Sequence, residues 1–129
     1  MVAVTQLRSA IASAIDNPSV WQVFSFPPAS PLANSIEIMP DDPYIEPTNN
    51  AYNTIAPMAH FRLRLIVPLF DNQGNLNGIE DFMTQLFNKL SASNLVFRFG
   101  NFTAPSVLPV DAGQMLTSEL SISILTSWS

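Results

Sequence analysis

The sequence predicts a single α+β domain over residues 1–129, with a mixed or antiparallel β-sheet of about five strands and two helices packed on one face. Three observations lead to this fold class. Two segments carry apolar residues at helical spacing, and several others alternate apolar and polar residues as strands do. The two kinds of segment are interspersed along a chain of 129 residues, a length that fits one domain.

The first expected helix covers residues 4–15, where apolar residues recur at helical spacing. It ends near Pro18, because a proline disfavours the helical conformation of the residue before it. The aromatic and β-branched residues of 20–26 then predict a strand that stops at a pair of prolines. A second, short strand is expected over 35–39.

The segment 40–57 is expected to be an ordered loop that packs on a neighbouring subunit. Its prolines, aspartates and asparagines disfavour long regular elements. Apolar side chains such as Tyr44 lie among them, which argues against a solvated linker. A second loop is expected over 100–114, and irregular but ordered loops of this kind are natural suppliers of contacts between subunits.

The strongest strand pattern covers residues 59–69, where apolar side chains alternate with mostly polar ones. A turn at 71–75 precedes the second expected helix at 79–90, whose start has the form of a capping box. Further strands are expected over 95–99 and about 115–125. The strand 59–69, the second helix and the strand 95–99 could form one βαβ crossover.

Charged side chains are scarce in this chain. They make up 12% of the residues, whereas 47% are hydrophobic. About a quarter charged is ordinary for a globular domain. The charges are therefore too few to cover a monomer in the usual mixed pattern, and we expect other subunits to cover part of the surface.

Several classes of partner are disfavoured by the composition. The formal net charge is −5 and no run of Lys or Arg occurs, which argues against phosphate-driven binding of nucleic acid but not against DNA passing nearby. No apolar run approaches the ~20 residues that span a bilayer. The N-terminus lacks the pattern of a signal peptide, so we expect a soluble protein made in a cytoplasm, with no membrane partner. Without cysteine, neither a disulfide nor a thiolate metal site can form.

No catalytic residue, cofactor or metal ion is predicted, and the protein is expected not to be an enzyme. The single histidine, His60, is interpreted as a polar-face strand residue, because catalysis would need a nucleophile or a carboxylate beside it. The carboxylates of Asp41, Asp42 and Glu46 could offer oxygen ligands to Ca²⁺. Their spacing is not that of a calcium loop, so a turn with capping or inter-subunit salt bridges is favoured.

Three of the five cations, Arg62, Arg64 and Arg98, would line one sheet face if their strands are neighbours. Such a face is either solvated or an interface that meets carboxylates of another subunit, and the scarcity of charge favours the interface. Trp128 lies next to the C-terminus, where it could dock on a partner. The predicted interface residues are Asp41, Asp42, Tyr44, Glu46, Arg62, Arg64, Arg98 and Trp128.

The order of these features resembles that of a known family. The segments that carry the resemblance follow a short N-terminal helix and comprise residues 20–24, 26–29, 41–47, 60–65 and 69–72. Together they resemble the small tail-terminator and tail-completion proteins of siphophages, particularly those that infect actinobacteria. The likeness covers most of the chain, and the proline pair at 27 and 28 and the Asp-Pro-Tyr sequence at 42–44 carry most of it.

The resemblance implies a structural virion protein that forms a closed ring, typically of six copies. Such a ring ends polymerisation of the tail tube and offers the surface that joins the head, so its partners are the tail tube protein and the head–tail connector protein. DNA would pass through the lumen without specific binding, and the protein would reside in the tail or neck of the virion after assembly in the host cytoplasm. The alternatives are another neck or tail component, such as a connector or a tube subunit, or a small metal-binding module.

Overall fold

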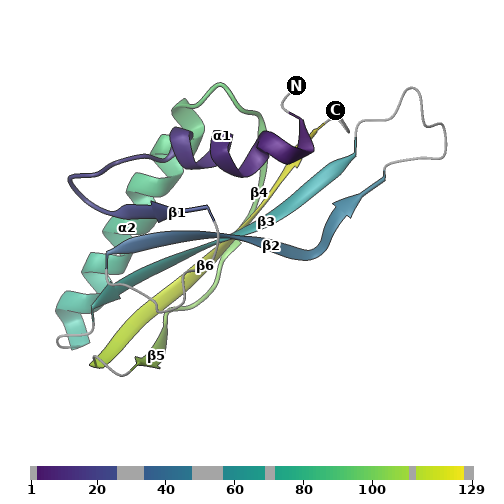
Figure 1. Ribbon diagram of the computed structural model, residues 1–129. Helices are drawn as coiled ribbons and strands as arrows, with labels where there is room; N and C mark the ends of the chain where they lie inside the picture. Colours follow the sequence, from purple (N-terminus) through teal and green to yellow (C-terminus); the bar gives the residue numbers. More distant parts are fainter. Residues whose placement is uncertain (1–2, 26–33, 48–56, 69–71, 111–112, 127–129) are drawn as a thin grey trace.

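The computed structural model describes residues 3–25, 34–47, 57–68, 72–110 and 113–126. The helical elements are η1 (Val4–Gln6), α1 (Leu7–Ala14) and α2 (Asn72–Ala92). The strands are β1 (Gln22–Phe24), β2 (Ser35–Glu46), β3 (Met58–Pro68), β4 (Phe97–Phe102), β5 (Ser106–Val110) and β6 (Gly113–Leu125). They form one six-stranded sheet in the order β1-β2-β3-β6-β4, with β5 also paired to β6 (Figure 1).

The predicted fold class is confirmed: the chain is α+β, and the sheet is mixed. Only β1 and β2 pair in parallel among the described strands, and the other pairs are antiparallel. Strands β3 and β4 both run antiparallel to β6, so they are parallel to each other and are joined by α2. The expected βαβ crossover therefore exists, but β6 lies between its two strands.

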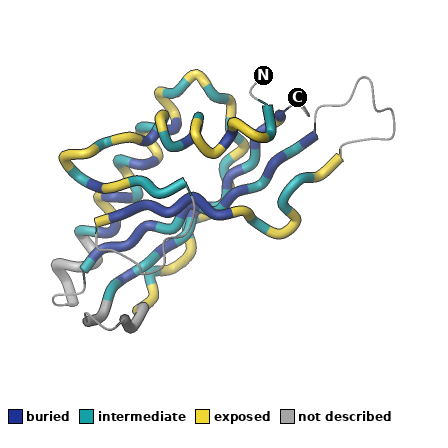
Figure 2. The backbone as a smooth tube through the Cα atoms, in the orientation of Figure 1, coloured by how far each residue is buried: buried dark blue, intermediate teal, exposed yellow. Residues whose placement is uncertain are grey.

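The buried apolar residues that the structure describes form a hydrophobic core between the helices and one face of the sheet. On β3, Phe61, Leu63 and Leu65 are fully buried, and both neighbouring strands continue this apolar layer, as the dark central strands of Figure 2 show. Helix α1 adds Leu7 and Ile11 to the same cluster, and α2 also contributes to it. The two helices thus cover one face, as predicted, and none of the described helical residues lies on the opposite face of the sheet.

The expected loop 40–57 is wrong over its first part, because β2 continues to Glu46. The pairing with β3 passes from Pro40–Phe61 to Ile45–Ala59, so residues 41–44 form a bulge opposite His60, with a cis peptide bond between Asp42 and Pro43. Strand β1 covers β2 only from Ser35 to Glu37, which leaves the bulged part at an edge of the sheet. Prolines are tolerated on edge strands and at bulges, so they did not end this one.

Two other boundaries differ from the prediction. Helix α2 begins at Asn72, so the expected turn at 71–75 and the capping box after it are wrong where the structure describes them. A helix that is already formed extends through residues such as Gly at a modest cost of about 1 kcal/mol each, which local turn signals do not reveal. The expected loop 100–114 contains the end of β4 and all of β5. Among the described residues, no helix combines the length and the apolar character needed to cross a bilayer.

Candidate functional site

Charged side chains from three neighbouring strands meet on the helix-free face of the sheet. Arg62 and Arg64 lie on β3, between Glu119 of β6 and the carboxylates of β2. Glu119 accepts a hydrogen bond from Arg62 Nη1 at 3.2 Å and another from Arg64 Nε at 3.4 Å. The prediction that both arginines share one sheet face is confirmed.

The β2 side completes this cluster. Arg62 Nε lies 3.3 Å from Asp41 Oδ1, in an ion pair whose geometry is not that of a hydrogen bond. Arg64 Nη1 lies 3.6 Å from Glu37 Oε1. Both arginines therefore already contact carboxylates of their own chain, and a role between subunits stays a prediction.

Glu37 is the most buried member of the cluster, with only 2% of its surface exposed. Burial raises the pKa of its carboxyl group, and the neighbouring Arg64 opposes that rise. A buried carboxylate is tolerated when a cation lies beside it, so Arg64 is the residue that allows Glu37 to be charged inside the fold. Sequence alternation gave no sign of this burial, because Glu37 occupies the polar position of an alternating strand.

His60 lies between a serine and a carboxylate, which the sequence did not suggest. Its Nδ1 atom is 2.7 Å from Ser123 Oγ, and its Nε2 atom is 3.0 Å from Glu46 Oε1. These residue types are those of a Ser-His-carboxylate triad. His60 lies on the polar face of β3, as predicted, but the two residue types that catalysis would require lie beside it, and the absence of enzymatic activity stays a prediction.

The surroundings of Ser123 do not fit nucleophilic catalysis. Ser123 is paired with His60 of β3 on one side and with Arg98 of β4 on the other, so its backbone belongs to the sheet ladder. An oxyanion hole needs free N–H groups that point at the reacting carbonyl. The contacts of His60 instead join β2, β3 and β6 across an open sheet surface, and we interpret them as structural.

This interpretation predicts that Ser123 is not an activated nucleophile. A fluorophosphonate probe, which labels activated serines, is expected to leave the protein unlabelled, with a known serine hydrolase in the same reaction as the positive control. Mass spectrometry of the intact chain is the measurement. An adduct on Ser123 that disappears in the His60→Gln variant would contradict the structural interpretation and support an enzyme.

The other predicted interface residues have different surroundings. Tyr44 packs on the core, with its ring centroid 5.5 Å from that of Phe61 in an edge-on contact. Asp42 is exposed at the bulge, and Arg98 is exposed on β4, on the same face as Ser123. The structure thus places seven of the predicted interface residues, whereas Trp128 lies outside the described residues.

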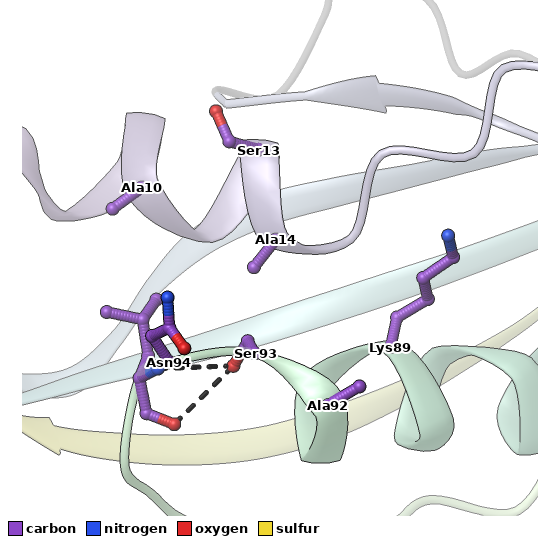
Figure 3. A pocket seen from close by; sticks show the side chains of 8 residues that line it. Ala10, Ser13, Ala14, Lys89, Ala92, Ser93 and Asn94 are labelled. Atoms are coloured by element: carbon purple, nitrogen blue, oxygen red, sulfur yellow. Dashed lines mark hydrogen bonds between the residues drawn. The ribbon is translucent and has the colours of Figure 1, made fainter.

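A cavity of about 490 Å³ opens between α1 and the C-terminal end of α2 (Figure 3). Ala10 and Ala14 of α1 face Ala92 across it, and Lys89 supplies its single charged side chain. Ser93 at its floor donates a hydrogen bond to Leu90 O at 2.7 Å, so this hydroxyl serves the end of the helix. The lining offers no group of side chains suited to acid–base or nucleophilic chemistry.

Comparison with known proteins identifies no family. No protein-family model matches the chain, and no curated protein resembles it significantly. Within the described ranges, no three His, Asp or Glu side chains are grouped so that they could hold a metal ion. The helix-free sheet face is therefore the candidate functional surface on the strength of its geometry alone.

Proposed function

We propose that this chain is the subunit of a closed ring that caps a phage tail tube, which makes it a tail terminator. The observation that carries the proposal is a sheet whose helix-free face is charged and whose two outer edges are open among the described residues. An open sheet edge offers unpaired backbone groups with which another chain can pair. The low charge content, with 12% of the residues charged, supports the same conclusion.

A ring requires two different surfaces on each copy. A head-to-tail contact closes into a ring when its rotation divides a full turn, and it forms a filament otherwise. Two dissimilar sheet edges supply such a contact, whereas identical edges would give a dimer. The remaining axial surfaces would then meet the tail tube protein on one side and the head–tail connector protein on the other, with DNA passing through the lumen.

Two related functions use the same features. A connector would form a ring without affinity for the tail tube, and a tube subunit would form long open polymers. The net charge of −5 and the absence of a basic run support a lumen along which DNA slides without being held.

The experiment that tests this function asks whether the purified chain closes into rings and caps isolated tail tubes. We expect a defined oligomer, either free in solution at high concentration or formed only at the tube end. Light scattering over a range of concentrations, with and without tubes, measures the oligomer in solution and its binding to the tubes. A protein that stays monomeric and has no affinity for tubes would rule the proposal out.

A further inference from the structure

The two open edges of the sheet lie at the same level along the strands. Within the described residues, β4 is paired on one side only, to β6, and the bulged part of β2 is paired on one side only, to β3. Arg98 of β4 is paired with Ser123 of β6, and Ser123 is paired with His60 of β3. His60 in turn lies opposite the bulge 41–44 of β2. One straight row across the sheet therefore begins at Arg98 and ends at the acidic bulge.

The charges at the two ends of this row are opposite. Arg98 is exposed and makes no ion pair with any described residue. At the other end, Asp42 is exposed, Asp41 faces Arg62, and 57% of the Glu46 side chain remains accessible beside His60. The β2 edge thus carries an excess of negative charge at the level where the β4 edge carries a positive one.

Apolar side chains match on the opposite, helix-covered face. Beside β4, Phe87 of α2 is 43% exposed, and its ring centroid lies 4.8 Å from that of Phe99. At the β2 edge, Tyr44 and Ile45 are only partly buried. Each edge therefore combines a charged group on one face with apolar groups on the other, which is the pattern of a specific interface.

The strand directions fit a rotation. Because β2 runs antiparallel to β3, β3 to β6, and β6 to β4, the two open edges run in opposite directions within one chain. When one copy is rotated onto the next about an axis parallel to the strands, each strand keeps its direction and its position along that axis. The rotation therefore brings β4 of one copy beside β2 of the next in an antiparallel arrangement, with Arg98 beside the bulge.

We propose that a second copy of this chain docks through its bulged β2 edge onto β4, and that Arg98 of one copy pairs with Asp42 of the next. This inference rests on the proposed ring and names the contact that closes it. Pro40 and Pro43 remove backbone donors from the β2 edge. The contact therefore depends on side chains, and the same prolines prevent indiscriminate pairing of edges.

Two single variants with reversed charge test the contact in the full-length protein. Arg98→Glu or Asp42→Arg alone places like charges together at every contact of the ring. Each is expected to raise the concentration at which half of the protein is assembled by roughly tenfold or more. Arg8→Glu is the matched control, because it makes the same charge change at an exposed arginine of α1 and is expected to assemble like the wild type.

A mixture of the two single variants separates this contact from other arrangements. Copies that alternate around the ring restore an opposite-charge pair at each contact, so an equimolar mixture is expected to recover assembly with even numbers of copies. Native mass spectrometry and light scattering, with and without tail tubes, provide the readout, and thermal melting confirms that each variant is folded.

The outcomes distinguish this contact from the ring itself. The proposed contact would be contradicted if the wild type forms rings and Arg98→Glu assembles equally well, or if the mixture does not recover assembly. Either result would leave the proposed ring in place. Loss of tube binding by Arg98→Glu with its rings intact would also overturn the contact, since the β4 edge would then face the tube. If neither the wild type nor Arg8→Glu assembles under any condition, both proposals fail.

Discussion

Replacing Trp21 with alanine is expected to lower the free energy of unfolding by about 3–5 kcal/mol, the usual cost of truncating a buried aromatic side chain. Trp21 is only 2% exposed, and its Nε1 atom donates a hydrogen bond to Ile15 O at 2.8 Å. Its ring meets that of Phe82 on α2 edge-on, with centroids 5.4 Å apart. One side chain therefore links the end of α1 to α2, and its loss leaves a cavity at that junction.

Urea denaturation followed by far-ultraviolet circular dichroism measures this loss, because the signal does not depend on the tryptophan that is removed. Trp21→Phe is the matched control: it keeps most of the apolar volume but loses the donor to Ile15, so a smaller loss of about 1–2 kcal/mol is expected. If the unfolding free energy of Trp21→Ala lies within about 1 kcal/mol of that of the wild type, the proposed role of Trp21 in joining the two helices is wrong.

The Arg64→Leu substitution is expected to lower the free energy of unfolding by about 2–3 kcal/mol, because it leaves the buried Glu37 carboxylate without its cation. The value falls below that of a fully buried pair because 30% of the Arg64 side chain is accessible to solvent. Arg98→Leu provides the matched control, since Arg98 is exposed on the same face without an ion pair among the described residues. Its effect on the unfolding free energy of the monomer is expected to stay within about 0.5 kcal/mol.

The loss of unfolding free energy in the Arg64→Leu variant is expected to become smaller as the pH falls. Burial raises the pKa of Glu37 above its ordinary value of 4.5, so the folded state takes up a proton more readily than the unfolded state. The penalty of the unpaired carboxylate is therefore present above the folded pKa and disappears as the pH falls through it. The double variant Glu37→Gln/Arg64→Leu is expected to recover most of the stability at neutral pH, and a double variant as unstable as Arg64→Leu would contradict this account.

The fold class and the two faces of the central strands could be predicted because alternation along a strand depends on local sequence alone. The alternation of apolar and polar residues along β3 and β6 correctly predicted that Arg62 and Glu119 lie on the face opposite the core. The contact between these two residues could not be predicted, because it depends on the register of strands more than 50 residues apart in the chain. The contact of His60 with Ser123 could not be predicted for the same reason, and its contact with Glu46 could not be predicted because residue 46 was expected to lie in a loop.

The largest error in the predicted fold concerned the acidic segment after residue 39. Pro40 and Pro43 are strong local signals for a loop, but the edge of a sheet accepts them at a bulge. Whether β2 ends or continues is decided by the partner strand β3, which holds residues 45 and 46 in register beyond the bulge. Asp42 in this segment is nevertheless exposed, and the proposed contact between copies depends on that exposure.

The most direct test of the tail-terminator function is negative-stain imaging of isolated tail tubes incubated with the purified chain. The proposal predicts additional ring-shaped density at one end of each tube and none along its length. It also predicts that capped tubes no longer grow when tail tube protein is added, whereas tubes incubated with the folded Arg98→Glu variant keep growing. Tubes that remain bare at both ends, or that are coated along their sides, would contradict the proposed function.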